Sequence, residues 1–232
     1  MLRYRYSPWF FWNCCSAVTM IATSHSEQLF CSACRAGHVM KDHAMNSNVK
    51  PAFESFEDYS LSMERALVEL FALAIPILAA QAALWLWMWD LGSLTRGLDS
   101  VLSLQVGGPL FVVGVLTHEL VHGVTWKVVG RLRWKDIRFG IQLKTFTPYA
   151  SPTVPMRARA YRIGVMMPLI VVGLIPFAVG LIFGYSQLAV FGMVFTFVAG
   201  GDLAVLRAMR SVASSAWVQD HPERAGCYVV AA

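Results

Sequence analysis

The sequence predicts an all-α integral membrane protein with about four transmembrane helices and a short β-strand or hairpin in a basic cytoplasmic loop. Of the 232 residues, 56% are hydrophobic and only 14% are charged, whereas a soluble domain carries about a quarter charged residues. The mean hydropathy is +0.53. Four apolar segments approach the ~20 residues that a helix needs to cross ~30 Å of hydrocarbon. They are Ala66–Trp89, Val106–Val129, Ile163–Phe183 and Leu188–Leu206.

The distribution of positive charge predicts how these segments are oriented. Loops on the cytoplasmic side of a membrane are enriched in lysine and arginine. We therefore expect the basic 127–162 loop and both chain termini to be cytoplasmic. A pI near 9.1 would also suit nucleic acid, but few aromatic residues interleave with the basic ones, so we predict no nucleic-acid partner. Against the single acidic residue Asp136, the loop carries Lys127, Arg131, Arg133, Lys135, Arg138, Lys144, Arg157, Arg159 and Arg162.

One part of the basic loop has the pattern of a strand. Ile137–Lys144 alternates apolar and polar residues with a period of two. Pro148, Pro152 and Pro155 follow, and we expect these prolines to stop regular structure. The strand has one apolar face, and either it lies on the membrane as a connector or its free edge binds an extended substrate segment.

Residues 1–50 differ in composition from residues 51–232, which we expect to form the four-helix domain. The first segment is basic and then apolar, as in a signal or transit peptide. Cys31 and Cys34, followed by two histidines, could bind zinc as a small knuckle. We favour an N-terminal extension that is disordered, or a start of translation downstream at Met40 or Met45.

The pentapeptide His118-Glu119-Leu120-Val121-His122 lies within the second apolar segment. Ionisable side chains in hydrocarbon are unfavourable and are functional candidates by default. Residues four apart lie one turn apart on the same face of a helix, so both imidazoles can reach one metal ion. Glu119 on the same turn can then reach a metal-bound water. The spacing therefore predicts a zinc site with a general base.

A catalytic zinc usually takes three protein ligands, so a third must come from elsewhere. Asp202 is the only charged residue within the fourth segment and follows two glycines that allow close helix approach. His122 and Asp202 each lie five residues before a basic residue that begins a cytoplasmic stretch, about 7–8 Å inside the helix end. We predict Asp202 as the third ligand, with His221 in the tail as the alternative.

Several of these motifs together resemble a known family. The residues that carry the resemblance are the pentapeptide, the Arg157–Tyr161 approach to Pro168, the Gly-Gly-Asp run ending at Asp202 and the Asp-His-Pro-Glu tail at 220–223. The chain resembles small four-helix bacterial and archaeal zincin-like membrane metallopeptidases. These proteins are related to the site-2 proteases, which are intramembrane zinc metalloproteases. The resemblance covers roughly residues 60–230.

The resemblance implies a zinc metalloendopeptidase of the HExxH type that hydrolyses peptide bonds of membrane-associated substrates near the cytoplasmic face. It implies that His118, His122 and Asp202 hold Zn²⁺ and that Glu119 is the catalytic base, activating a zinc-bound water. The expected partners are a membrane protein or peptide substrate and the lipid bilayer. The expected location is the plasma membrane of a prokaryote.

Two other classes of function are compatible with the same residues. A metal-binding membrane protein without catalytic activity would keep zinc and show no turnover. A small transporter could use the polar side chains as an ion pathway, although the four segments show no repeat of the kind that transporters contain.

Overall fold

The computed structural model describes residues 57–142, 147–222 and 224–230. The predicted N-terminal extension of residues 1–50, with its Cys31 and Cys34 pair, lies outside the described residues. Within them, four helical stretches are long and apolar enough to cross a membrane: Met63–Met88, Leu104–Val129, Ala158–Phe183 and Ser186–Ala208. Each corresponds to a predicted segment and begins a few residues earlier than expected.

The first two stretches are single helices, α2 (Met63–Met88) and α4 (Leu104–Val129). Ser62 caps α2 by accepting a hydrogen bond from the backbone N–H of Arg65 at 3.4 Å. The connection between them is itself a helix, α3 (Leu91–Leu102), which the sequence analysis did not predict. Asp90 caps α3 by accepting from the Ser93 N–H at 2.8 Å, which is the local signal that was available.

The third stretch remains helical through both of its prolines, Pro168 and Pro176. It consists of α5 (Ala158–Pro168), a wider π-helical segment η4 (Leu169–Leu174) and α6 (Ile175–Phe183). A proline removes one backbone donor and crowds the preceding turn. A local π-turn is one way for a helix to continue past such a position.

The fourth stretch is divided into α7 (Ser186–Val198) and α8 (Gly200–Ala208). The division falls at Ala199, three residues before Asp202. Asp202 therefore lies in the first turn of α8, and the N-cap residue Ala199 has no side-chain capping hydrogen bond.

The predicted strand is present as β2 (Ile137–Gln142), and it pairs antiparallel with β3 (Thr147–Pro152). The expectation that the prolines end regular structure was wrong for Pro148 and Pro152, which lie in β3. The Thr153 N–H donates to the Asp136 carbonyl, and the register then places Ser151 and Tyr149 at the hydrogen-bonded positions opposite β2. Pro148 and Pro152 occupy the alternate positions, where no N–H is needed for the ladder.

A second sheet was not predicted. Its strand order is β1-β6-β5-β4, and its three pairings are antiparallel. It joins three separate parts of the chain, and no single short strand has a strong alternating pattern of its own. The strands are β1 (Glu57–Asp58), β4 (Met156–Arg157), β5 (Trp217–Asp220) and β6 (Cys227–Val230). The fold is therefore mostly helical with two small sheets, which extends the all-α prediction.

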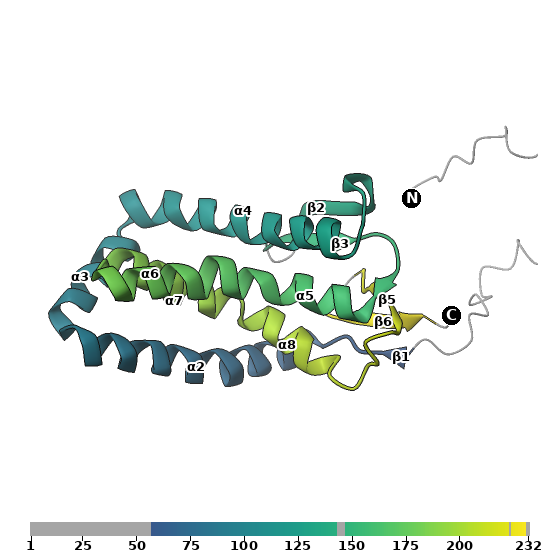
Figure 1. The fold of residues 1–232 in the computed structure, drawn as a ribbon, viewed down its shortest axis with the longest axis horizontal. Coiled ribbons are helices and arrows are strands. Elements are labelled where there is room, and N and C mark those ends of the chain that lie inside the picture. The colour runs from purple at the N-terminus through teal and green to yellow at the C-terminus, as the bar shows by residue number, and fades with distance from the viewer. Residues whose placement is uncertain (1–56, 143–146, 223, 231–232) are drawn as a thin grey trace, which may run out of the picture. The chain divides into compact units, whose positions relative to one another are not determined.

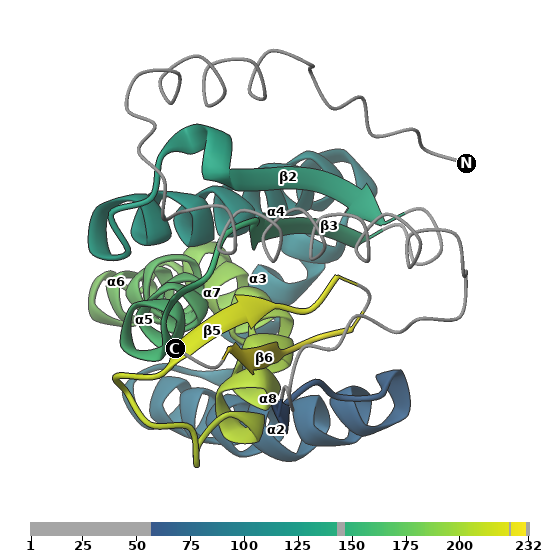
Figure 2. The same ribbon diagram turned by 90° about the vertical axis from the view of Figure 1, so that its right-hand side faces the viewer.

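Both sheets lie at the same end of the helices, and α3 and the turn between α6 and α7 lie at the other end (Figure 1). The end-on view shows β2 and β3 beside α4, with β5 and β6 nearer to α8 (Figure 2). A buried apolar cluster that includes Trp126, Met156 and Val218 joins the helix ends to the strands. This end of the molecule carries the polar residues that the sequence analysis selected.

Candidate metal centre

The structure brings together the three predicted metal ligands from two helices. His118 and His122 lie on α4 and are 4% and 5% exposed, and Asp202 lies on α8. The Nε2 atom of His118 is 3.1 Å from Oδ2 of Asp202, and Nε2 of His122 is 3.5 Å from Oδ1. One candidate ligand atom from each of the three residues lies within 4.8 Å of the others, a spacing that could hold one metal ion.

The approach of α8 to α2 places Asp202. A Cβ added to Gly200 would lie 2.9 Å from Cγ of Leu70 and 3.1 Å from Cβ of Ala74, so the glycine permits this close contact. Farther along α8, Nε of Arg207 lies 3.2 Å from Oε2 of Glu69 on α2. The packing of Gly200 and the ion pair of Arg207, on either side of Asp202 in the sequence, thus fix α8 so that the Asp202 carboxylate faces α4.

The orientation of His122 follows from one hydrogen bond. Its Nδ1 lies 2.9 Å from the backbone carbonyl oxygen of Gly164 on α5. Because a carbonyl oxygen only accepts, Nδ1 carries the proton in this contact, and the lone pair of the neutral ring is on Nε2. That nitrogen faces Asp202, which is the arrangement that metal-binding histidines commonly show.

Aromatic packing restrains the same imidazole. The His122 ring stacks on Trp126 at 5.3 Å between centroids, and Trp126 stacks on Tyr161 at 5.8 Å. The Trp126 Nε1–H also donates to the Tyr161 backbone carbonyl at 3.2 Å. Trp126 is 3% exposed, so it has little room to move. This support was not predicted, although Trp126 follows His122 at helical spacing.

We expect Gly164→Ala to destabilise the fold and to weaken metal binding. The added Cβ would lie 2.0 Å from Nε1 of Trp126, a buried ring that cannot shift without moving His122. Overpacking of this kind costs about 1–3 kcal/mol. Thermal unfolding and zinc titration of the detergent-purified variant would measure both effects. Gly201→Ala is the stability control, because its Cβ would meet nothing within 4 Å. Equal stability and equal zinc affinity for Gly164→Ala and wild type would contradict the prediction.

The donor set fits a divalent cation. Apart from the 3.1 Å contact between Oδ2 of Asp202 and Nε2 of His118, the buried Oδ2 of Asp202 and Nδ1 of His118 have no hydrogen-bond partner among the described residues. A buried carboxylate oxygen without a donor is unfavourable unless a cation balances it. Two imidazoles and one carboxylate are a ligand set found in catalytic zinc sites, where a fourth position stays open.

Glu119 lies on the same turn of α4 and lines a cavity of about 1000 Å³ together with the three candidate ligands. The backbone N–H of Ala150 on β3 interacts with its carboxylate. Ala150 lies opposite Phe139 of β2 in a pair that is not hydrogen-bonded, so its N–H points to the free edge of the hairpin. The hairpin edge therefore lies beside the predicted base.

His221, the alternative third ligand, lines the same cavity but is not part of the metal-capable group. Its Nδ1 accepts a hydrogen bond from the Arg224 backbone N–H at 2.9 Å, and its ring lies 4.7 Å from that of Tyr228. The tail that contains it, from Asp220 to Gly226, contributes further residues to the cavity wall. The structure thus places Asp202, and not His221, beside the two histidines.

A second polar group links the tail to the hairpin and to α5. Asp220 accepts hydrogen bonds from the hydroxyl of Tyr161, at 2.6 Å, and from that of Ser151 on β3. Burial raises the pKa of the Asp220 carboxyl to about 6, although the two hydroxyl donors act in the opposite direction. Since Tyr161 also stacks on Trp126, this cluster connects the cavity wall to the packing behind His122.

The fold and the site together define a mostly helical protein with a buried cluster of two histidines and one aspartate that could hold a metal ion beside a glutamate. Residues 111–217 match a protein-family model described as "Putative zincin peptidase". The matched range contains all three candidate ligands and Glu119, and a zincin family implies zinc. No curated protein and no solved structure matches the chain.

Proposed function

We propose that this protein is an intramembrane zinc metalloprotease that hydrolyses peptide bonds of membrane-associated substrates near the cytoplasmic face. The observation that carries the proposal is the placement of Asp202 within 3.1–3.5 Å of both histidines of the HExxH pentapeptide, from a helix far away in the sequence. Three ionisable side chains on two apolar helices are energetically unfavourable in a membrane unless a bound cation compensates them, so they indicate a functional site. The match to a zincin peptidase family supports the same conclusion.

In this proposal His118, His122 and Asp202 hold the zinc. Bound there, zinc would polarise the substrate carbonyl and lower the pKa of water. Glu119 would accept the proton of the attacking water and pass it to the leaving amine. The Gly164 carbonyl keeps the proton of His122 on Nδ1, and the Ala150 N–H orients the Glu119 carboxylate. The four apolar helices would cross the bilayer, with both chain termini and the two sheets on the cytoplasmic side.

The free edge of β3 would hold the substrate in an extended conformation. At the positions that face away from β2, Pro148 and Pro152 have no N–H, and the N–H of Ala150 is directed to the Glu119 carboxylate. The Pro152 carbonyl already accepts a hydrogen bond from Gln219 at 3.3 Å. The carbonyls of Pro148 and Ala150 thus remain for substrate N–H groups, which limits strand addition to a short segment beside Glu119.

Removal and restoration of the metal test the proposal. The protein, purified in detergent and reconstituted with a panel of single-span membrane peptides, should cleave at least one of them. A chelator should abolish this cleavage, and stoichiometric zinc should restore it, because the attacking water would be activated only at the zinc-loaded site. Bound zinc without cleavage of any peptide in the panel would favour the non-catalytic metal-binding protein. Metal flux into vesicles would favour the transporter.

A further inference from the structure

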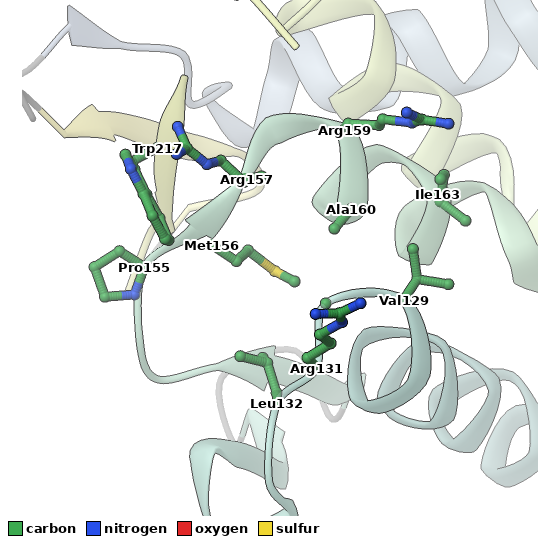
Figure 3. A pocket seen from close by; sticks show the side chains of 11 residues that line it. Val129, Arg131, Leu132, Pro155, Met156, Arg157, Arg159, Ala160, Ile163 and Trp217 are labelled. Carbon is green, nitrogen blue, oxygen red and sulfur yellow. The ribbon is translucent and has the colours of Figure 1, made fainter. Parts of the chain in front are cut away.

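A separate pocket lies between the end of α4 and the beginning of α5, with a volume of about 550 Å³. Three arginines and several apolar side chains form its wall (Figure 3). We propose that this pocket binds the phosphate headgroup of an anionic phospholipid. The proposal rests on the membrane placement proposed above and is independent of peptide cleavage.

The positive charge of the pocket is not balanced by acidic side chains of the described part of the chain. Arg131, Arg157 and Arg159 line it, and none of them forms an ion pair with an acidic residue among those the structure describes. Arg157 is held in place, because its guanidinium lies 4.3 Å from the centroid of Trp217 and donates to the Ser215 carbonyl. Arg131 and Arg159 are exposed and remain available to an anion. Arginine guanidinium groups can bind phosphate oxygens in a bidentate manner.

The rest of the wall is apolar and lies where a lipid would be. Val129, which is 43% exposed, is the last residue of α4, and Ile163 lies in the second turn of α5. Figure 3 shows both beside the pocket, on the side away from Trp217. Since two candidate spans end and begin here, the arginines lie at the expected level of the headgroups and the aliphatic side chains at that of the first acyl carbons. A free phosphate ion would use only the charged part of this wall.

The backbone at Arg131 gives an independent indication. Its φ of 55° lies in the left-handed region, and it is the only non-glycine residue with positive φ among those described. The Leu132 N–H donates to the Trp126 carbonyl, so Arg131 occupies the helix-terminating position that glycine usually takes. A larger residue there costs about 1–2 kcal/mol. Here the conformation directs the guanidinium into the pocket (Figure 3), and strain of this kind often accompanies a functional position.

This geometry provides a test variant that should not harm folding. Arg131→Gly removes the charge and places glycine at a position that favours it, so the melting temperature should stay equal or rise. Combined with Arg159→Gln, it removes the two unpartnered charges. Arg65→Gln with Arg210→Gln is the matched control, because both of these arginines are exposed and lack an ion pair among the described residues.

The full-length protein in neutral detergent would be titrated with phosphatidylglycerol, phosphatidylcholine and glycerol 3-phosphate, with bound lipid counted by native mass spectrometry. We expect selective binding of phosphatidylglycerol, weakened about tenfold or more in the Arg131→Gly/Arg159→Gln variant, because charge-assisted hydrogen bonds are lost. The control variant should bind like wild type. Arg131→Lys/Arg159→Lys should recover part of the affinity, since lysine keeps the charge without the bidentate geometry.

Equal weakening in the pocket and control variants would overturn the proposal, because the attraction would then be general. Binding of glycerol 3-phosphate as tight as that of phosphatidylglycerol would also overturn it, in favour of a soluble phosphate ligand. Neither readout involves cleavage. Loss of selective lipid binding in a protein that still cleaves would refute this inference alone, and selective binding in a protein that never cleaves would refute only the proposed protease.

Discussion

Glu119→Gln abolishes peptide hydrolysis and leaves the zinc content unchanged; this is the expected result with the largest effect on activity. Glutamine has nearly the volume of glutamate, and its amide oxygen can still accept from the Ala150 N–H. It cannot take up a proton from water, so the general-base contribution is lost. Such a contribution is typically about 10²–10⁴-fold, and we expect cleavage to fall by at least this factor.

The measurement is cleavage of a reconstituted membrane peptide, with zinc quantified on the same samples. Glu64→Gln is the control, because this glutamate is exposed in the first turn of α2 and does not line the cavity with Glu119. Hydrolysis at the wild-type rate by Glu119→Gln would remove Glu119 as the base. Loss of zinc together with activity would instead mean that the carboxylate binds the metal.

The second large effect concerns the metal itself. The purified protein should contain about one zinc per chain, because three candidate ligands converge within 4.8 Å. His118→Ala and Asp202→Ala should each lower zinc affinity by more than about 100-fold, since hydrogen-bond partners of ligands alone are worth about 10–100-fold. Metal analysis and competition with a chelating dye would check this.

His221→Ala is the matched control for that experiment, because it removes a histidine that lines the same cavity outside the metal-capable group. It should retain zinc. If Asp202→Ala retained zinc and His221→Ala lost it, the assignment of the third ligand would be reversed. If the wild-type protein bound no zinc after metal was added back, the protease proposal would fail.

Part of the candidate site could be predicted from local sequence. His118, Glu119 and His122 lie on one continuous helix, whose period by itself places them on one face. The apolar lengths of the four segments likewise predicted their positions to within a few residues. These features depend on helix geometry and on hydrophobicity, which are properties of adjacent residues.

Other parts depend on contacts between residues far apart in the chain. Asp202 was selected as the only charge in its segment, but its distance from His118 depends on the break at Ala199 and on the contact of Gly200 with α2. The two glycines before Asp202 indicate a close helix approach, but nothing within α8 specifies that the neighbouring helix is α2 or that the chain breaks at Ala199. The prolines of β3 were misjudged for a similar reason, because their effect depends on which edge of the strand each one faces.

The sequence by itself determined the four apolar helices, the two histidines with Glu119 between them, and the two possible third ligands, Asp202 and His221. Helical period, segment length and the unfavourable energy of charge in hydrocarbon are sufficient for these. Only the tertiary structure decided that Asp202 rather than His221 lies beside the histidines, that Gly164 and Trp126 orient His122, and that the tail completes the cavity wall. The His122–Gly164 and Trp126–Tyr161 hydrogen bonds join residues 42 and 35 positions apart, so the support of the imidazole depends on how α4 packs against α5.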